Sequence, residues 1–324
     1  MQRIPYLIIG AGLAGIAAAR MLPPGQTCIL EKSRGPGGRM ASKRLETCRA
    51  DIGAQFLTVR DPGFQAVIQS ASEVGAVAQW SPSMGVIRDG TVTASPDQQP
   101  RYVGTPYMNA LSQFLASGLN ITTQSRATRV ERHASGYHVH CEDGQIIDAE
   151  QILVTTPVDQ MHALLSEFSV DMIRTRFAMA PTLTIVVESP QQALTSVDGP
   201  IEACFGGHDP VVDFVSFDGS KPGRNNAFWV IHSTPEWIAP RLEEDVSVSG
   251  QALFSYVAKH LGLEGLLIHT HRWRYARPVD PKTTAQKGVY QVDDGLWIAG
   301  DYLAGGRVEG AYLSGIEAAK RLLA

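Results

Sequence analysis

Residues 6–15 read Tyr-Leu-Ile-Ile-Gly-Ala-Gly-Leu-Ala-Gly, an apolar run that leads directly into three spaced glycines. An alanine-rich stretch from Ile16 to Leu22 follows, and a second apolar run from Thr27 to Leu30 ends in the acidic Glu31. This order predicts a strand, a tight turn, a helix and a second strand, as in dinucleotide-binding βαβ units. The stretch therefore indicates an α/β chain with a Rossmann-like domain.

Each residue type in this turn has a physical role in holding a dinucleotide. Gly10 permits the tight turn, Gly12 lets the backbone approach a pyrophosphate, and Gly15 lets the helix pack closely on the strand. Free N–H groups at the start of the helix provide positive potential for phosphates. Glu31 can accept hydrogen bonds from a ribose diol. This pattern alone does not separate FAD from NAD, and a glycine turn that binds nothing is the alternative.

A second glycine-rich block follows Glu31. Residues 33–40 read Ser-Arg-Gly-Pro-Gly-Gly-Arg-Met, and residues 51–56 read Asp-Ile-Gly-Ala-Gln-Phe. Paired glycines between two arginines let backbone amides and guanidinium groups reach the far side of a pyrophosphate. An ordinary glycine loop in a solvated basic patch is the alternative. Beside the first motif, the block favours FAD.

The C-terminal segment offers a third part of the same site. Residues 295–301 read Gly-Leu-Trp-Ile-Ala-Gly-Asp, and Arg307 opens a terminal helix. We expect Asp301 to bind the ribityl or pyrophosphate region, and the helix N-terminus to stabilise negative charge on reduced flavin. Small residues at helical spacing predict a face that approaches a sheet or the cofactor closely: Gly310, Ala311, Ser314 and Gly315. A plain capping helix is the alternative.

Composition limits the class of protein. The chain has 324 residues, 44% hydrophobic and 19% charged, which suits a two-domain soluble enzyme. A net charge of −4 argues against binding to nucleic acid or to an anionic membrane surface. Neither a signal peptide nor an 18-residue apolar run is found, so we expect a cytoplasmic protein. Four scattered cysteines argue against disulfides and thiolate metal sites, and none adjoins Asp301, which favours non-covalent FAD: Cys28, Cys48, Cys141 and Cys204.

The flavin motifs lie at both ends of the chain, so the nucleotide domain must be discontinuous. We place the FAD-binding domain at residues 1–60, 105–160 and 285–324, and the substrate domain at residues 61–104 and 161–284. In the latter, strands outnumber helices, which predicts a mixed or antiparallel sheet. We expect strands at 127–131, 137–141, 152–156, 183–188, 211–217 and 227–232, a turn at 134–136, and a helix at 246–261.

The middle of the chain shows no metal-ligand motif and no nucleophile elbow, so we predict no metal and no catalytic acid–base pair. His269 and His271 alternate on a strand, as a packed pair or as metal ligands. His232 is either structural or faces the cleft. Trp273 and Tyr275 are either aromatic core or walls beside a flat substrate. A dihydropyridine needs stacking, alignment and exclusion of water, and no general base, to give hydride to flavin, whereas amine oxidation needs a neutral amine.

These blocks, with residues 152–157 closing a middle strand, resemble flavoproteins related to the monoamine oxidases, and within them the bacterial renalases. The renalase resemblance rests on residues 32–40, 53–55, 179–182, 271–278 and 306–311. It implies an FAD-dependent oxidase whose substrates are the 2- and 6-dihydro isomers of NAD(P)H and O2, and whose products are NAD(P)+ and hydrogen peroxide. A flavin amine oxidase or desaturase acting on another flat apolar substrate is the alternative, as is a non-catalytic dinucleotide-sensing flavoprotein.

The resemblance and the motifs together imply the site residues. The FAD contacts would be Gly10, Gly12, Leu13, Ala14, Gly15, Glu31, Lys32, Gly38, Arg39, Ala54, Gln55, Ala127, Asp301 and Val308. The substrate contacts would be Gln55, Phe56, Leu57, Thr58, Val59, Ala94, Ser95, Pro96, Thr182 and Tyr302. The sequence departs from the family at Tyr302, where relatives often carry Trp, and around Leu57 and Val59. These departures affect the expected ring-stacking geometry.

Overall fold

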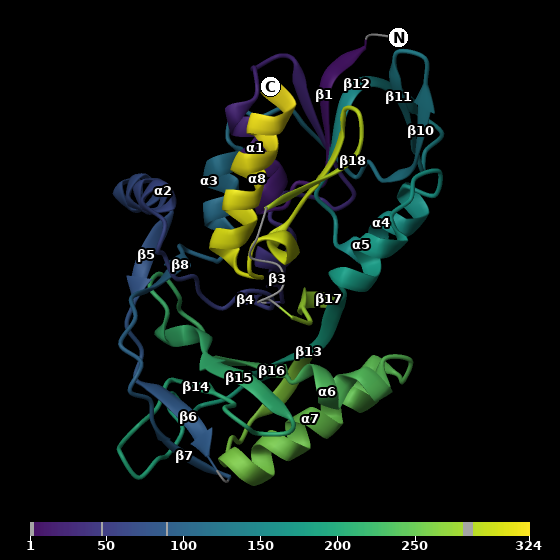
Figure 1. Cartoon of the computed structure of the whole chain (residues 1–324). Helices are drawn as coiled ribbons and strands as arrows, with labels where there is room; N and C mark the ends of the chain where they lie inside the picture. Colours follow the sequence, from purple (N-terminus) through teal and green to yellow (C-terminus); the bar gives the residue numbers. More distant parts are fainter. Residues whose placement is uncertain (1–2, 47, 89, 281–287) are drawn as a thin grey trace.

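The computed structural model describes residues 3–46, 48–88, 90–280 and 288–324. Its described strands form two large sheets, one in the upper and one in the lower half of Figure 1. The first sheet has eight strands in the order β10-β11-β12-β1-β2-β9, with β19 beside β12 and β18 beside β19. The second has seven, in the order β17-β13-β16-β15-β14-β6-β7. This confirms the predicted α/β fold with a Rossmann-like part and a mixed second sheet.

Parallel strands form the centre of the first sheet. β1 (Ile4–Ile9) lies between β2 (Thr27–Glu31) and β12 (Ile146–Val154), and both pairings are parallel. These strands are rich in Ile, Val and Leu because helices and loops bury both of their faces. β12 pairs with β11 through its first half and with β19 through its second. The other strands are β9 (Ile121–Thr123), β18 (Val289–Asp293) and β19 (Leu296–Ala299).

An antiparallel hairpin forms one edge of this sheet. β10 (Ala127–His133) and β11 (Gly136–Cys141) are joined by the short turn that the sequence predicts. Alternate residues of β11 are buried, as expected when only one face of a strand packs on the core. The polar residues of the hairpin therefore share the outer face.

Helices α1 (Leu13–Met21) and α8 (Val308–Leu323) pack together beside the first sheet (Figure 1). A Cβ at Gly315 would lie 2.1 Å from the Ala14 carbonyl oxygen, so only glycine permits this approach. A Cβ at Gly310 would lie 2.2 Å from the carbonyl oxygen of Ala304. The predicted small-residue face exists, but at Gly315 it meets helix α1 rather than a sheet or cofactor.

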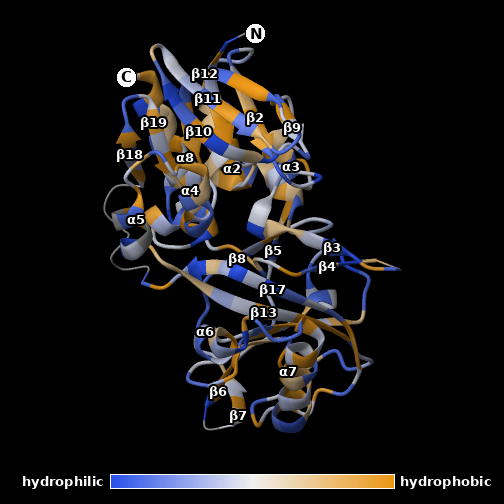
Figure 2. Ribbon diagram, turned by 90° about the vertical axis from the view of Figure 1, so that its right-hand side faces the viewer, coloured by the Kyte–Doolittle hydropathy of each residue, from blue (hydrophilic) through white to orange (hydrophobic). Residues whose placement is uncertain are grey.

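The second sheet is antiparallel except for the β14–β6 pair. Helix α7 (Val246–Leu261) packs against it through Leu253, Val257 and Leu261. Asp245 caps the helix by accepting from the Ser247 N–H at 2.8 Å. In Figure 2, α7 carries hydrophobic and hydrophilic residues side by side, as an amphipathic helix does. The strands are β6 (Met84–Arg88), β7 (Thr91–Ala94), β13 (Met179–Glu188), β14 (Ala203–Phe205), β15 (Val212–Phe217), β16 (Phe228–Ser233) and β17 (Leu266–Pro278).

Shorter elements connect the two sheets. Two-stranded pairs are formed by β3 (Ser42–Arg44) with β4 (Arg49–Asp51), and by β5 (Val77–Trp80) with β8 (Arg101–Gly104). The remaining α-helices are α2 (Pro62–Glu73), α3 (Ala110–Ala116), α4 (Val158–Leu164), α5 (Asp171–Arg176) and α6 (Pro235–Ile238). The single-turn helices are η1 (Gly38–Met40), η2 (Asp218–Ser220), η3 (Ala239–Arg241) and η4 (Asp301–Leu303).

The strands of the two sheets come from different parts of the chain. Residues 4–31, 121–154 and 289–299 supply the first sheet, and residues 84–94 and 179–278 supply the second. The domain limits given above stay a prediction, and the limit at residue 285 lies outside the described residues. Every helix in the described part of the chain is too short or too polar to span a membrane.

Candidate functional site

A cavity of about 1390 Å³ lies between the two sheets. On one side it is lined by the carboxyl ends of parallel strands, at Ile9, Leu30 and Thr155. On the other side it is lined by β17 and by Thr182 and His232 of β13 and β16. Ligands of parallel α/β sheets bind outside the carboxyl ends of the strands, so this cavity is the candidate site.

The glycine turn after β1 leaves open space at the cavity. Gly10 has a φ of 110°, a conformation that favours glycine. A Cβ at Gly15 would lie 2.1 Å from the Gly10 carbonyl oxygen, so this glycine is required for packing. At Gly12, in contrast, no atom lies within 4 Å of a Cβ position, and Gly12 lines the cavity. The turn therefore has room for a phosphate group against its backbone.

Glu31 lines the cavity and also holds the turn. Its Oε2 accepts a hydrogen bond from the Ala11 N–H at 2.8 Å, and its Oε1 accepts from the Ser33 N–H at 2.8 Å. The residue is 6% exposed. Oε1 also accepts from the Ser33 hydroxyl, so a ribose hydroxyl can donate to the second lone pair of Oε2 while these bonds persist.

Arg39 and Asp301 form an ion pair that joins the two ends of the chain at the cavity. Arg39 Nη1 donates to Asp301 Oδ2 at 2.9 Å, and Nη2 donates to Oδ1. Nη1 also donates to the Ala276 carbonyl oxygen at 3.0 Å. Burial alone would lower the pKa of Arg39, but the charge and hydrogen bonds of Asp301 outweigh it and raise that pKa. The guanidinium thus fixes Asp301 in place.

Strand β17 supplies the opposite wall, with residues 270–277 lining the cavity. Three arginines alternate here with aromatic residues, and each arginine has a protein partner. Arg274 pairs with Glu243 at 2.7 Å, Arg277 pairs with Asp213 at 2.8 Å, and Arg272 donates to the Leu242 carbonyl oxygen at 2.7 Å. Trp273 and Tyr275 line the same wall.

Two histidines face the cavity in the neutral form. Burial, followed by the positive charges of Lys221 and Arg277, lowers the pKa of His232 to about 4, although a hydrogen bond to Ile52 opposes the shift. Burial and the neighbouring His269 lower the pKa of His271 to about 4 as well. Both imidazoles are therefore uncharged near neutral pH, where they can donate or accept a hydrogen bond.

Comparison with known proteins identifies the family. The model of the flavin containing amine oxidoreductase family matches residues 86–323, most of the chain. The chain belongs to this family. A model of an NAD(P)-binding Rossmann-like domain matches residues 8–70, which include the glycine turn.

Two solved structures share the whole fold. A protein described as a protoporphyrinogen oxidase from Exiguobacterium sp. 255-15 superposes with a TM-score of 0.75 at 13% identity, over 99% of both chains. An engineered double mutant of putrescine oxidase superposes with a TM-score of 0.74 at 14% identity, again over 99% of both chains. At these identities the similarity establishes the fold.

The cofactor of this flavin containing amine oxidoreductase is FAD, and the cavity fits it. The open space at Gly12 gives room for a phosphate, Glu31 at the end of β2 is an acceptor for ribose hydroxyls, and the N-terminus of α8 provides N–H donors. Most of the predicted FAD contacts line the cavity: Gly10, Gly12, Leu13, Ala14, Glu31, Lys32, Gly38, Arg39, Ala54, Ala127, Asp301 and Val308. Gly15 and Gln55 do not belong to its lining. The individual contacts stay a proposal.

Gln55 corrects the sequence-based assignment, because its amide is occupied by protein partners. Its Oε1 accepts from Lys221 Nζ at 2.9 Å and from Ser216 Oγ at 3.0 Å. Its Nε2 donates to the carbonyl oxygens of Gly53, at 3.0 Å, and of Asp51. Gln55 is 4% exposed and stands outside the cavity lining, so we no longer assign it a substrate or FAD contact.

Gln55 belongs to a buried charged network. Lys221 Nζ lies 2.8 Å from Asp218 Oδ1 and 3.5 Å from Asp51 Oδ2, and Arg224 Nη2 donates to Asp51. All four charged side chains have no exposed surface. Burial alone would raise the pKa of Asp218, but Lys221 and Arg224 outweigh it and lower that pKa. The network binds the segment after β4 to the second sheet.

Other predicted substrate contacts lie away from the cavity. The Phe56 ring packs beside Trp80, Phe205 and Phe214, under the Arg101 guanidinium. Leu57 is buried and pairs with Tyr102. Among the predicted substrate residues, only Thr182 lines the cavity. The rest of the predicted set does not. Thr58 and Val59 follow Leu57, Ala94 ends β7 at the sheet edge opposite β17, and Ser95 and Pro96 come directly after that strand.

Tyr302 also corrects the resemblance-based assignment. It is fully buried, and a Cβ at Gly300 would lie 2.4 Å from its ring. Its hydroxyl donates to the Thr156 carbonyl oxygen at 3.3 Å. The ring supports the turn before Asp301 and has no face open to a substrate.

The resemblance at residues 271–278 assigns no role to the arginines of that segment. The alternation of cationic and aromatic residues in one strand was the available signal, since such a strand suits a planar anionic ligand. His269 and His271 lie side by side on β17, with ring centroids 6.4 Å apart. Trp273 and Tyr275 line the cavity wall, which is one of the two positions predicted for them.

Proposed function

We propose that this flavoprotein is an oxidase for the 2- and 6-dihydro isomers of NAD(P)H, as its resemblance to bacterial renalases implies. In the overall reaction a dihydronicotinamide, O2 and one proton give NAD(P)+ and hydrogen peroxide. The dinucleotide loses a hydride, and the two electrons reduce O2 to the peroxide. We further propose that the FAD is held without a covalent bond.

The β17 wall is the observation that carries this proposal. Arg277 puts a cation on the wall that carries Trp273 and Tyr275, near His232, whereas Arg272 and Arg274 contact residues 242–244 from the other face of the strand. A pyrophosphate favours guanidinium partners, and a nicotinamide ring favours an aromatic wall. On the side of the cavity formed by the second sheet, the carboxylate of Asp213 is paired with Arg277. The wall therefore suits an anionic planar ligand better than an ammonium ion.

The neutral cavity wall also fits the chemistry. Bound FAD would supply the hydride acceptor for the reaction. The imidazole of His232 is uncharged near neutral pH, and the Thr182 hydroxyl donates to the Ser233 carbonyl oxygen. These groups can orient a carboxamide and exclude water. A dihydropyridine becomes aromatic when it loses hydride, so these side chains need take no proton from it.

Oxidation of an amine on another flat substrate is the second candidate, favoured by the aromatic pair Trp273 and Tyr275. An amine substrate must approach as the neutral form beside Arg277, which repels its protonated form. A flavoprotein that senses dinucleotides without turnover is the third.

Anaerobic stopped-flow reduction separates the candidates. The holoenzyme is mixed with 2-dihydro- or 6-dihydroNAD(P), with ordinary 4-dihydro NAD(P)H, or with putrescine, and the visible flavin absorbance is followed. We expect rapid bleaching by the first two, little by the 4-dihydro isomer, and none by putrescine. Fast bleaching by an amine would favour the second candidate, and no bleaching by any donor the third.

Arg277→Ala tests the role of the β17 wall. The change removes one cation and leaves Asp213 unpaired, so we expect KM for the dihydronucleotide to rise about tenfold with kcat nearly unchanged. Arg321→Ala is the matched control, because Arg321 also pairs with an acid, Glu317, at 2.8 Å, but on the exposed end of α8. Equal KM values in the two variants would contradict an anionic ligand at this wall.

A further inference from the structure

The outer face of the β10–β11–β12 sheet brings together side chains that are distant in sequence. His138 on β11 is paired with Glu131 on β10 and with Asp148 on β12. His133 lies two residues after Glu131, so its side chain shares this face. The opposite face carries the buried Val130 and Val139. The pairing register thus gathers two imidazoles and a carboxylate on the solvent side.

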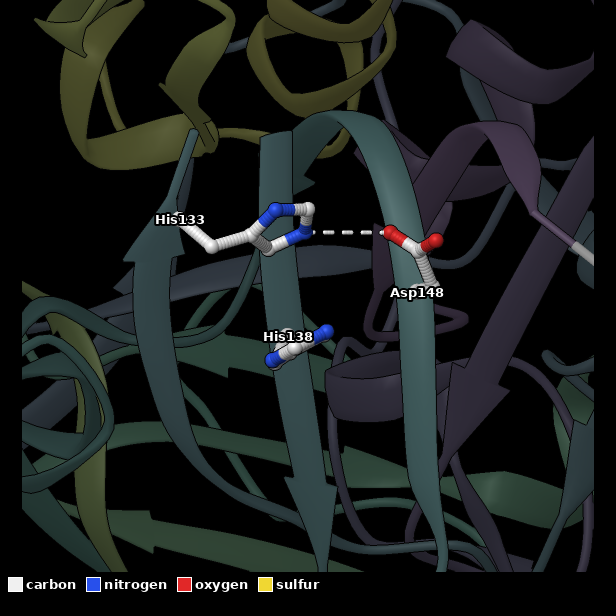
Figure 3. A group of neighbouring side chains, drawn as sticks. All are labelled: His133, His138 and Asp148. Carbon is white, nitrogen blue, oxygen red and sulfur yellow. Dashed lines mark hydrogen bonds and ion pairs between the residues drawn. The ribbon is translucent and has the colours of Figure 1, made fainter. Parts of the chain in front are cut away.

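The ligand atoms of His133, His138 and Asp148 lie within 4.8 Å of one another. His133 Nε2 is 3.1 Å from Asp148 Oδ1, and the two imidazole centroids are 4.2 Å apart. Figure 3 shows the three side chains on neighbouring strands, with a dashed line joining His133 to Asp148 and His138 beside that pair. Ligands of one zinc ion stand about 3.4 Å apart for bonds of about 2.1 Å, so small side-chain rotations would suffice.

We propose that His133, His138 and Asp148 bind a divalent transition-metal ion of the zinc type. Two nitrogens and one oxygen suit zinc and its neighbours, whereas magnesium and calcium prefer all-oxygen sites. Water would complete the coordination, because the three residues are only half-buried. This site revises the sequence-based prediction that the chain has no metal ligands.

Two neighbouring groups compete with the ion. The Ser135 N–H donates to His133 Nδ1 at 3.4 Å, so the metal must displace the Nε2 proton that points at Asp148, after which Nδ1–H can donate to Ser135 Oγ, also at 3.4 Å. Arg3 Nε lies 3.8 Å from Asp148 Oδ1 and 3.6 Å from a carboxylate oxygen of Glu150. The arginine competes with a cation for Asp148, so its removal should strengthen metal binding.

The ion would stabilise three strands rather than take part in the oxidation. His133 ends β10, whereas Ala127, at the start of that strand, lines the FAD cavity. Six residues of strand span about 20 Å. The three ligands come together only in the folded sheet, so zinc at about 100 times its Kd should lower the unfolding equilibrium constant about 100-fold.

Calorimetric titration of the FAD-loaded protein with zinc chloride tests the site. We expect one ion per chain, and a loss of affinity of at least about tenfold in His138→Ala and in Asp148→Asn. His162→Ala is the matched control, because His162 also pairs with an aspartate, Asp171, at 3.2 Å on the surface. Absence of zinc binding by the wild type, or unchanged binding in His138→Ala, would overturn the proposal.

Arg3→Ala gives a test of opposite sign. We expect zinc affinity to rise severalfold, whereas a merely structural Arg3 would leave it unchanged or weaken it. FAD content and the unfolding midpoint without zinc should match the wild type in His138→Ala, which shows that the variant folds. An affinity in Arg3→Ala equal to or below that of the wild type would contradict the assignment of Asp148 as a ligand.

Discussion

At the scale of single residues, Glu31 performs two tasks with one carboxylate. It accepts from the backbone at Ala11 and Ser33, and it faces the cavity where a ribose is expected. A residue at the end of a strand can often be replaced without harm to the fold. Here, however, two backbone N–H groups would lose their acceptor.

Glu31→Ala should therefore weaken both FAD binding and the fold. We expect FAD affinity to fall by about 1.5–3 kcal/mol, and the free energy of unfolding of the apoprotein by about 1–3 kcal/mol. Fluorescence titration with FAD and urea unfolding measure the two effects. Glu73→Ala, at the exposed end of α2, is the control. Unchanged FAD affinity in Glu31→Ala would show that the ribose is held elsewhere.

His232 makes stability depend on pH. Its pKa is about 4 in the folded chain, against about 6.5 for an unfolded histidine. Between pH 6.5 and 4, His232 binds a proton in the unfolded state but stays neutral in the folded state. The free energy of unfolding should thus fall as pH drops from 6.5 to 4, by at most about 3 kcal/mol from this group.

Urea unfolding at several pH values, on the wild type and on His232→Gln, measures the contribution. Glutamine keeps a hydrogen-bond acceptor but does not titrate. In the variant, the free energy of unfolding should therefore change less steeply with pH between 6.5 and 4. A slope equal to that of the wild type would show that His232 does not cause it.

At the same scale, the sequence predicts roles that depend on backbone shape better than roles that depend on partners. Gly12 and Glu31 could be assigned because a βαβ turn fixes where they stand. Gln55 and Tyr302 were assigned wrongly, because a resemblance gives a position but not the side chains that surround it. The cavity position of Arg277 depends on how β17 pairs with β13.

At the scale of elements, the contact between α1 and α8 positions the end of the chain at the cavity. Gly315→Ala would place a Cβ 2.1 Å from the Ala14 carbonyl oxygen, so α8 must shift. We expect a loss of about 1–3 kcal/mol in unfolding free energy, as in overpacked cores, and weaker FAD binding because Val308 and Ala311 line the cavity. Thermal unfolding and FAD titration are the measurements.

Lys320→Ala is the control for this substitution, since Lys320 lies on the exposed side of the same helix. It should leave both quantities nearly unchanged. Equal unfolding free energies and FAD affinities in the two variants would show that the contact between α1 and α8 can accommodate a methyl group.

Elements with strong local patterns could be predicted. Helix α7 has the predicted bounds, since Asp245 caps its start and Gly262, with a φ of 65°, ends it. The metal-ligand cluster could not be predicted. His138 lies five residues after His133 and ten before Asp148, and these spacings bring the side chains together only through the register of β10, β11 and β12. Local sequence sets the strands, whereas long-range pairing sets their neighbours.

At the scale of the whole molecule, the buried network around Gln55 holds the β3–β4 pair to the second sheet. Lys221 provides one of its two cations, against the acids Asp51 and Asp218. In addition, Thr184 of β13 and Trp273 of β17 donate to the Ile52 carbonyl oxygen at 3.1 and 3.0 Å. The segment from Asp51 to Gln55 is therefore fixed from the substrate side.

Lys221→Met should destabilise the chain strongly. The change leaves a buried negative charge without its partner, which costs about 3–5 kcal/mol. Lys320→Met, on the exposed side of α8, is the control and should cost little. Urea unfolding measures both. A cost below about 1 kcal/mol at Lys221 would show that the two remaining acids and Arg224 readjust without penalty.

The walls of the FAD cavity come from both ends of the chain, and this has a consequence for biosynthesis. Gly12 leaves the ribosome early, but Asp301 and Val308 follow only after almost the whole chain has been made. At ordinary rates of translation this interval is on the order of 15–60 s. Until its end, β12 lacks its neighbour β19 and α1 lacks its partner α8, whereas the last strand of the second sheet, β17, is complete before Asp301 is made. We therefore expect flavin to bind only to the finished chain. The amount of active enzyme in a cell should then depend on the supply of free FAD after translation rather than during it.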